Sequence, residues 1–371
     1  MAKLGEVCKV SPSTKNIERQ GAWLLNLDMV EQQTGRVIEY KYVGEDDLNG
    51  SIIQFDTENV LYSKLRPNLN KVVLPQKDGF STSELLPLRP DARVLNRDYL
   101  AVFLRSDSFV TWAVSKTAGA KMPRLGTKDL MSAEIPVPTI EQQKKIAEKF
   151  KKLEQLISLR KQQLAKLDEL VKARFVEMFL LHDYPTKTLD ELSIGKGEYG
   201  AQSASTEYDS TRPRYIRITD VNEDGTLNDD KVSSENITDD EQYRLSYGDF
   251  MFARMGATVG KTYAFLSGNQ IFAGYLIRYK LNLSLANPRY LFWYTKLDDY
   301  QKWVKLNQSG AAQPGINAKK YGSLKIPVPP IALQNQFAAF VERVDQQKQT
   351  VQQSLEKLEL MKKALMQEYF G

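Results

Sequence analysis

A proline-containing segment occurs twice in this 371-residue chain, as IPVPTIEQQ at residues 135–143 and as IPVPPIALQ at residues 326–334. Ile135 and Ile326 stand 191 positions apart, and the same offset aligns the residues after them without a gap. The identical pairs include Ala147/Ala338, Leu164/Leu355, Leu167/Leu358, Lys172/Lys363, Ala173/Ala364, Glu177/Glu368 and Phe179/Phe370. Because this period is far longer than that of a solenoid repeat, each copy is predicted to be domain-sized. We therefore expect two halves, each a globular region followed by a long helix.

A long helix is expected after each proline segment. Glycine and proline are absent between Pro138 and Pro185, and the prolines of the segment itself keep the chain extended until the helix begins. Apolar residues then recur at alternating steps of four and three, which is typical of a coiled-coil seam. They are Ile146, Phe150, Leu153, Ile157, Leu164, Leu167, Val171 and Met178 in the first copy, and Phe337, Val341, Val344, Val351, Leu355, Leu358 and Leu365 in the second. Arg160, Arg174, Lys348 and Lys362 occupy the remaining seam positions.

Each helix should run for about 40 residues, or roughly 60 Å at 1.5 Å per residue. Two helices with matching seams most simply pack on each other, and an antiparallel pair would relate the halves by an approximate two-fold axis. The alternative is that each helix only covers its own domain. The predicted division is a globular region at 1–138, a helix at 139–182, a second globular region at 183–329 and a second helix at 330–371.

The globular regions carry short strand-like runs, and the repeat persists in them with diverged loops. VLYSKLRPNLNKVV (60–73) aligns with FMFARMGATVGKTY (250–263) at an offset of 190. Both runs predict a hairpin whose tip carries cations and turn-forming residues. These are Lys64, Arg66, Asn68 and Lys71 in the first copy, and Arg254 and Lys261 beside glycines in the second. Such a tip suits contact with DNA phosphates and base edges. An ordinary solvated hairpin would carry similar residues, but recurrence at aligned positions favours a shared role.

Two further sets of residues are candidates for the same role. The loop before each IPVP segment carries Lys121 and Arg124 in the first copy and Gln313 in the second. A connecting turn is an equally good interpretation of that loop. Arg214 and Arg217 belong to a basic cluster beside Tyr215, which could grip a phosphate backbone or form the exposed face of a strand.

Composition excludes several kinds of chemistry. The net charge of +5 and the pI near 8.9 are compatible with nucleic acid without demanding it. Cys8 is the only cysteine and His182 the only histidine, so an internal disulfide, a cysteine zinc site and a serine–histidine–aspartate triad are not expected. Phosphate-loop and HExxH motifs are absent. No apolar run approaches a membrane span, and we expect a cytoplasmic protein. Asn287 and Pro288 are interpreted as the capped start of a helix.

Two variable regions, each closed by IPVP-x-I-x-x-Q and a long helix, resemble the specificity subunit of type I restriction–modification systems. The resemblance spans the chain and is carried by residues 135–179 and 326–370, with the runs SKLRP (63–67) and ARMG…GK (253–261). It implies an α+β fold in which two mixed α/β target-recognition domains are separated by two long antiparallel coiled-coil helices with a pseudo-two-fold internal repeat.

The resemblance also implies a role without catalysis. Each domain would read one half of a split, asymmetric DNA target, through the candidate residues named above. The helices would set the gap between half-sites and dock two methyltransferase subunits, and restriction subunits could join. S-adenosylmethionine, ATP and Mg²⁺ would be bound by those partners, with no cofactor, metal or catalytic residue on this chain. The alternatives are a coiled-coil scaffold that binds proteins, and a self-contained DNA-modifying enzyme.

Overall fold

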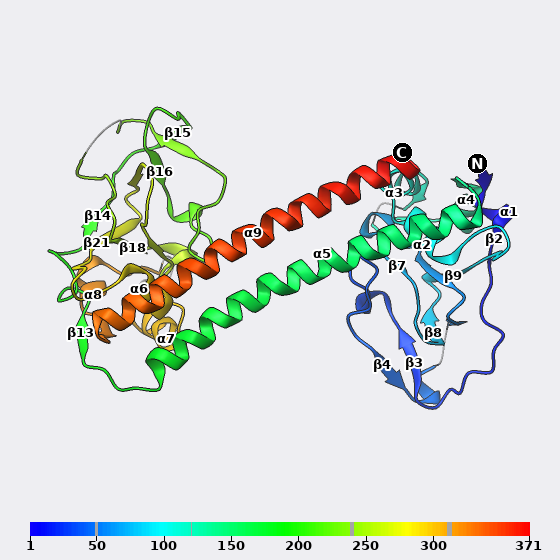
Figure 1. Cartoon of the computed structure of the whole chain (residues 1–371), viewed down its shortest axis with the longest axis horizontal. Coiled ribbons are helices and arrows are strands. Elements are labelled where there is room, and N and C mark those ends of the chain that lie inside the picture. The colour runs from blue at the N-terminus through cyan, green and yellow to red at the C-terminus, as the bar shows by residue number, and fades with distance from the viewer. Residues whose placement is uncertain (49–50, 120, 238–240, 310–313) are drawn as a thin grey trace. The chain divides into compact units, whose positions relative to one another are not determined.

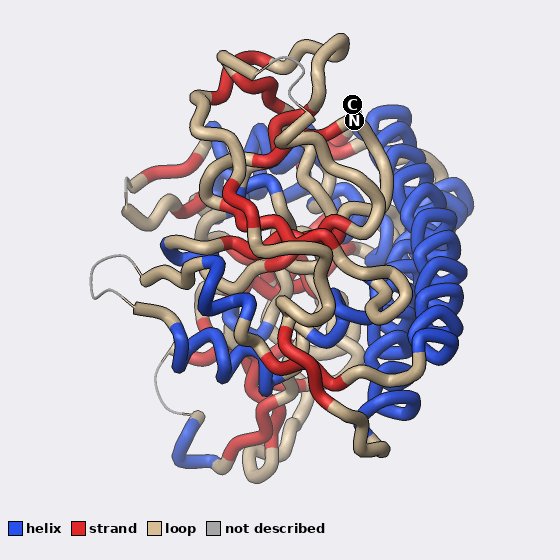
Figure 2. The backbone as a smooth tube through the Cα atoms, turned by 90° about the vertical axis from the view of Figure 1, so that its left-hand side faces the viewer, coloured by secondary structure: helices blue, strands red, loops and turns tan. Residues whose placement is uncertain are grey.

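The computed structural model of the chain describes residues 1–48, 51–119, 121–237, 241–309 and 314–371. The chain divides into two compact units, and the long helices contribute a part to each. The first unit comprises Met1–Gln162 with Gln352–Gly371, and the second comprises Gln163–Val351. Figure 1 labels the elements, and Figure 2 shows that short strands joined by long loops alternate with helices.

The first unit contains two four-stranded sheets, in the orders β2-β9-β6-β7 and β4-β3-β8-β5. Its strands are β1 (Ala2–Lys3), β2 (Cys8–Val10), β3 (Ala22–Leu25), β4 (Lys41–Val43), β5 (Ile52–Phe55), β6 (Val60–Ser63), β7 (Val72–Val73), β8 (Gly79–Thr82), β9 (Leu85–Pro90), β10 (Thr117–Ala118), β11 (Arg124–Leu125) and β12 (Glu134–Ile135). Its helices are α1 (Leu4–Val7), α2 (Arg97–Leu104), α3 (Asp107–Ser115), α4 (Thr127–Ser132), the first part of α5 (Ile140–Phe175) and the last part of α9 (Ile331–Phe370).

The second unit contains the equivalent sheet in the order β14-β21-β18-β19, together with three two-stranded pairs. Its strands are β13 (Thr186–Thr188), β14 (Glu198–Tyr199), β15 (Ser205–Glu207), β16 (Arg214–Ile216), β17 (Val232–Ser234), β18 (Asp249–Ala253), β19 (Thr262–Ala264), β20 (Gln270–Phe272), β21 (Leu276–Lys280) and β22 (Lys325–Pro327). Its helices are the last part of α5, α6 (Pro288–Tyr294), α7 (Asp298–Asn307), α8 (Ala318–Gly322) and the first part of α9. Asn287 caps α6 through its side chain and Pro288 is its first residue, as predicted.

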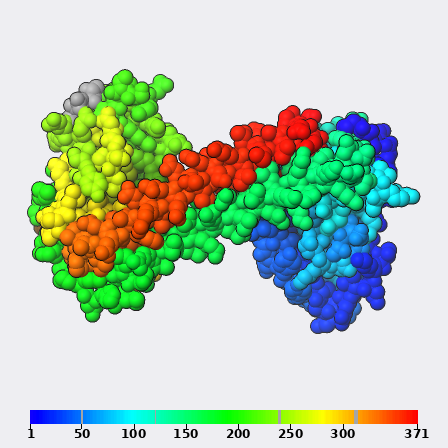
Figure 3. All heavy atoms as spheres, viewed as in Figure 1, coloured from blue at the N-terminus to red at the C-terminus, as the bar shows by residue number. Residues whose placement is uncertain are grey.

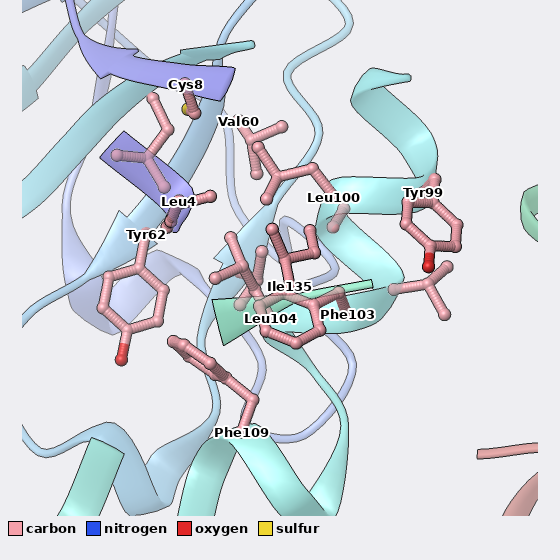
Figure 4. Packing of buried hydrophobic residues seen from close by; sticks show 14 of the residues in the cluster. Leu4, Cys8, Val60, Tyr62, Tyr99, Leu100, Phe103, Leu104, Phe109 and Ile135 are labelled. Atoms are coloured by element: carbon pink, nitrogen blue, oxygen red, sulfur yellow. The ribbon is translucent and has the colours of Figure 1, made fainter. Parts of the chain in front are cut away.

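The core of the first unit joins residues from both ends of the chain. Leu4 near the amino terminus and Phe370 near the carboxyl terminus belong to one buried cluster, with the rings of Tyr99 and Phe370 centred 5.4 Å apart. Figure 4 shows Ile135 of β12 among the aromatic and leucine side chains of α2 in this cluster. The last helical turn of the chain is therefore a structural part of the first unit.

The two predicted long helices are confirmed: α5 has 36 residues and α9 has 40. A five-residue π-helical segment, Val176–Leu180, continues α5. Every apolar seam position named above is buried or half-buried. Burying this stripe of apolar side chains is the main force that holds such a helix in place, because helix propensity alone contributes little.

Each unit contains a paired segment of α5 and α9. In the first unit Lys149 Nζ donates to Tyr369 Oη at 2.9 Å, and Lys362 Nζ donates to Glu154 Oε1 at 2.9 Å. The residue number rises along α5 as it falls along α9, so these two segments run antiparallel. In the second unit Lys348 Nζ donates to Asp168 Oδ1 at 2.6 Å, so the lysines at the polar seam positions pair with the facing helix.

The IPVP segments form short strands before the helices, as expected. Ile135 in β12 pairs with Ala2 in β1, and Ile326 in β22 pairs with Lys187 in β13, both antiparallel. Proline has no backbone N–H, so each segment offers more carbonyl acceptors than donors, and the donors must come from other parts of the domain. The Tyr99 hydroxyl donates to Pro136 O at 2.9 Å, and the Tyr290 hydroxyl donates to Pro327 O at 2.8 Å.

A buried glutamine locks the start of each long helix. Gln143 is fully buried; its Nε2 donates to Val94 O at 2.9 Å and to Pro138 O at 2.8 Å, while its Oε1 accepts from Asn96 N at 2.7 Å. The glutamine therefore ties the proline segment and the residues before α2 to the first turn of α5.

Gln334 makes the same bonds in the second unit. Its Nε2 donates to Leu285 O and Pro329 O, and its Oε1 accepts from Asn287 N at 2.8 Å. Each partner of this amide matches a partner of the Gln143 amide at the offset of 191. The final glutamine of IPVP-x-I-x-x-Q is thus a structural residue.

We predict that Gln143→Ala lowers the free energy of unfolding of the first unit by about 3 kcal/mol, because it leaves the part-buried N–H of Asn96 and the carbonyls of Val94 and Pro138 without partners. Chemical denaturation of the full chain measures this loss. Gln155→Ala, at an exposed position of the same helix, is the matched control and should stay within about 0.5 kcal/mol of the parent. Equal effects of the two substitutions would contradict the assignment.

Candidate nucleic-acid interface

In the first unit the two predicted loops form one surface. Arg66 N donates to Pro123 O at 2.8 Å, and Leu125 N donates to Lys64 O at 2.9 Å, with an antiparallel bridge between Leu65 and Arg124. The tip of the β6–β7 hairpin and the loop that precedes α4 are therefore held side by side by backbone hydrogen bonds.

The second unit repeats this frame with other side chains. Gly256 N donates to Pro314 O at 3.0 Å, and Ile316 N donates to Arg254 O at 2.9 Å, with a bridge between Met255 and Gly315. Each bond matches its counterpart at an offset of 190 on the hairpin and 191 on the loop. The sequence alignment of the hairpins is confirmed, and a main-chain frame common to both units carries the candidate residues.

Two positions of each hairpin adopt a left-handed backbone. Arg66 and Asn70 have φ of 50° in the first unit, while Gly256 and Gly260 have φ of 74° and 86° at the matching positions. Glycine adopts this region without strain, whereas a bulky residue such as arginine rarely does. An arginine kept in a strained conformation, where its counterpart is glycine, indicates a use for its side chain.

The tip of the first hairpin presents polar side chains to solvent. Arg66 and Asn68 are exposed and Lys64 is half-buried. Lys121, in the neighbouring loop, is also exposed. Arg124 points at Glu84, with Nη2–Oε1 at 3.3 Å, and this partly exposed pair is a weak one. Four cations and an amide therefore lie on the joined loops.

Lys71 differs from its neighbours because its ammonium group is used inside the domain. Its Nζ donates to Leu27 O at 2.6 Å, and burial lowers the pKa of Lys71 below its ordinary value. The ammonium group of Lys261, the candidate at the corresponding place in the second unit, also contacts groups inside its own domain. Its Nζ donates to Val221 O at 2.9 Å and pairs with Glu223. These two lysines therefore tie their hairpins to other segments of the same unit through backbone carbonyls.

Arg214 and Arg217 also make internal contacts. Arg214 Nη2 donates to Asn228 O at 2.7 Å. Arg217 binds Asp220 in a bidentate manner and also contacts Asp230, and the Asp220 hydrogen bonds raise the pKa of Arg217. Both guanidinium groups organise the loops around β16. Gln313 lies outside the described residues.

Arg254 is presented differently. Its Nε donates to Gly274 O at 2.9 Å, and its guanidinium carbon lies 5.0 Å from the ring centroid of Tyr199 and 5.9 Å from that of Tyr275. Within the described ranges, no carboxylate lies within ion-pair distance of this guanidinium. Its two amino groups are therefore not neutralised by a neighbouring acid.

Sequence reasoning missed the residue that faces each hairpin across the frame. Lys64 N donates to Glu84 O at 3.1 Å, and Arg254 N donates to Tyr275 O at 3.0 Å. Glu84 and Tyr275 match at the offset of 191 that relates the IPVP segments. Extending that offset back from the helices would have found them, whereas Tyr199 has no such signal.

Neither a metal centre nor a membrane span is found in the part of the chain that the structure describes. Among those residues, no cluster of three or more histidine, cysteine or acidic side chains could hold a metal ion. No helix formed by them has the length and apolarity needed to cross a membrane.

The sequence has recognisable relatives. The sequence model of the family described as "Type I restriction modification DNA specificity domain" matches residues 1–169 and 182–360. The chain is similar to the type I restriction enzyme EcoDI specificity subunit of Escherichia coli, with 26% identity over 124 residues that cover 33% of this chain and 27% of that protein. It is also similar to the type I restriction enzyme MjaVIII specificity subunit of Methanocaldococcus jannaschii, with 21% identity over 322 residues, 81% of this chain and 75% of that protein. The match to the first relative thus spans about a quarter of its length.

Solved structures share the fold. The crystal structure of a type I restriction-modification S subunit from M. genitalium aligns with a TM-score of 0.63 and 16% identity, covering 100% of this chain and 95% of that one. A chain from a structural study of complex assembly in a type I R-M system aligns with a TM-score of 0.59 and 17% identity, covering 100% and 96%. At these identities the likeness establishes the fold, with mixed helix and strand content in both units.

We predict that Arg66→Gly raises the free energy of unfolding by about 0.5–1 kcal/mol, because glycine relieves the left-handed strain, and at the same time weakens DNA binding. Arg66→Ala is the matched control: it removes the guanidinium but keeps the strain, so it should bind DNA as poorly without the gain in stability. Denaturation and DNA-binding titrations at fixed salt measure both effects. Unchanged DNA affinity in both variants would show that the strained arginine does not touch DNA.

Proposed function

The chain belongs to the family of type I restriction-modification DNA specificity subunits, with two specificity domains, and we propose that each domain reads one half of a bipartite, asymmetric DNA target. The observation that carries this proposal is the repeated main-chain frame with unlike side chains. Lys64, Glu84 and Arg124 occupy one frame where Arg254, Tyr275 and Gly315 occupy the other. Because bases are distinguished by side-chain donors and acceptors, two such frames would select different sequences.

We propose that the candidate residues do not contribute equally. Lys64, Arg66, Asn68, Lys121 and Arg124 would contact DNA in the first domain, and Arg254 in the second. Exposed cations on flexible stems suit phosphates, which position a protein on DNA without reading its sequence. Lys71, Lys261, Arg214 and Arg217 would act indirectly, since their charged groups already bind carbonyls or carboxylates of the chain.

The two long helices are proposed to form an antiparallel coiled coil that sets the gap between the half-sites. Support comes from the buried seam, from the ion pairs between facing helices, and from the matching contacts in the two units, which favour a pseudo-two-fold arrangement. The proposed domains are then 1–138 and 183–329, with helices at 139–182 and 330–371. DNA rises about 3.4 Å per base pair, so a rigid spacer selects a discrete gap.

Methyltransferase subunits are the proposed partners of the helices, with restriction subunits joining them. The paired helical segments of the first unit expose large apolar side chains that contribute nothing to the seam. They are Leu156, Leu159, Leu360 and Met361, which are between 47% and 69% exposed. In Figure 3, α9 lies at the surface in orange and red. Apolar side chains left on a surface commonly mark contacts with another protein.

We propose that this chain is not catalytic and that S-adenosylmethionine, ATP and Mg²⁺ bind to the partner subunits in the cytoplasm. The test compares adenine methylation across the genome of cells that express the methyltransferase subunits with and without this chain. A bipartite motif should be methylated only when the chain is present. Methylation by this chain alone would favour an enzyme, and a pattern that ignores the chain would favour a scaffold.

We predict that removing one heptad from each helix, residues 161–167 and residues 349–355, shortens the tolerated gap by about three base pairs. Seven residues of helix rise about 10.5 Å, and a whole heptad preserves the seam. Methylome mapping of the deletion variant measures the gap. Deleting only residues 163–166 is the comparison, since four residues break the register with the facing helix and should lower methylation. A paired deletion that keeps the original gap would exclude the helices as the spacer.

We predict that replacing Leu360 and Met361 together by glutamate weakens binding of the methyltransferase subunits at least tenfold, because two charges would have to be buried in the interface. Analytical ultracentrifugation of the mixed subunits measures the affinity. The matched control is Glu356→Gln with Lys357→Gln, which changes exposed polar positions of the same helix and should have little effect. Equal affinity for the parent and the glutamate variant would place the docking surface elsewhere.

A further inference from the structure

The guanidinium group of Arg254 is held in place from three directions. Its Nε donates to Gly274 O, and the aromatic rings of Tyr199 and Tyr275 approach its planar group at 5.0 and 5.9 Å. Its main chain is also fixed, because its N donates to Tyr275 O and its O accepts from Ile316 N. A long side chain on a hairpin tip is thereby confined to a narrow range of orientations.

The two tyrosines are themselves anchored differently. Tyr199 belongs to β14, where it pairs with Ile277, and its hydroxyl accepts a hydrogen bond from Ala318 N at 3.2 Å. Tyr275 precedes β21 and is 56% exposed. Within the described residues the Tyr275 hydroxyl has no hydrogen-bond partner. A large aromatic ring left this exposed gains little from burial, so its value lies in its contact with the arginine.

We propose that Tyr199 and Tyr275 position Arg254 to read a guanine in the major groove of the half-site bound by the second domain. With Nε occupied by Gly274 O, the two amino nitrogens of Arg254 remain to donate in parallel to the guanine O6 and N7 atoms, the usual bidentate contact of arginine with DNA. Pre-ordering the side chain removes the loss of rotamer freedom that binding would otherwise require. A phosphate contact would need only a charge, which a mobile lysine supplies.

The first unit lacks this arrangement on the same frame. Lys64 stands where Arg254 stands, and Glu84 replaces Tyr275. Lys64 offers a single positive charge and Glu84 a hydrogen-bond acceptor. Neither replaces the planar guanidinium group of Arg254, which lies against aromatic rings and has two parallel donors. The guanine contact therefore belongs to one half-site, and the two halves of the target differ at the corresponding position.

This inference rests on the proposed function, and the test separates the two. The assembled complex of this chain with its methyltransferase subunits is expressed in cells, and methylated adenines are mapped on the host genome. The variants are Arg254→Ala, Arg254→Lys, Tyr275→Ala and Tyr275→Phe. Lys302→Ala, a 71% exposed position on α7, is the control that should leave the motif unchanged.

The expected result for both Arg254 variants is that a single G·C pair in one half-site becomes degenerate, with discrimination there falling about tenfold to a hundredfold. Tyr275→Ala should relax the same base pair to a smaller degree. Tyr275→Phe keeps the ring and should retain the parent motif. This result would distinguish loss of the aromatic contact in Tyr275→Ala from a general loss of stability. Thermal unfolding of each complex identifies a variant that fails to fold. If Arg254→Ala is such a variant, the methylated motif of Arg254→Lys decides whether Arg254 reads the guanine.

Three results would overturn the inference. Uniformly lower methylation with an unchanged motif would make Arg254 a phosphate contact. Relaxation at several positions in both half-sites would make it a structural residue. A parent motif in Tyr275→Ala, with a relaxed one in Arg254→Lys, would remove the positioning role of the tyrosine. If the parent chain itself directs no sequence-specific methylation, the proposed function fails and not this inference alone.

Discussion

The rest of the structure depends on one buried side-chain amide, used once in each half. Gln143 and Gln334 are fully buried. Each lies in the first turn of a long helix and makes hydrogen bonds to the proline segment and to the residues just before α2 or α6. The prolines make such a residue necessary, because they supply no backbone N–H at the end of the strand and keep the chain extended until the helix begins. A glutamine can satisfy two carbonyls and one N–H at once. These bonds hold the first turn of each long helix against its domain.

The loops that diverged between the two halves are supported by equally regular main-chain bonds. Arg66 N to Pro123 O in one unit, and Gly256 N to Pro314 O in the other, join the hairpin tip to the loop before the IPVP segment. Main-chain hydrogen bonds tolerate almost any side chain, so the frame persists while its side chains change. This separation of frame from side chains explains how one architecture can hold a strained arginine in one copy and an aromatic-held arginine in the other.

Several cations that the sequence proposed as DNA contacts have internal partners. Lys71 and Lys261 reach carbonyls beneath their hairpins, and Arg217 is bound by two aspartates. In the sequence these residues look the same as Lys64 or Arg254, because a pattern records spacing and charge but not the neighbour that neutralises the charge. The neighbours are distant in the chain: Lys261 donates a hydrogen bond to Val221 O, and the Arg254 guanidinium group packs against the Tyr199 ring. Contacts of that range depend on how strands are ordered in a sheet.

The sequence by itself determined the duplication, the long helices with their seam, the hairpins and the strand before each helix, because all of these depend on local periodicity and on proline. It also indicated the family, which the match to both halves confirms. Tertiary structure decided what lies far apart in sequence. It placed Phe370 in the core that contains Leu4, joined two separately predicted loops into one surface, and brought Tyr199 and Tyr275 onto Arg254. The physical reason is that burial and hydrogen-bond pairing act between residues whose separation along the chain carries no periodic signal.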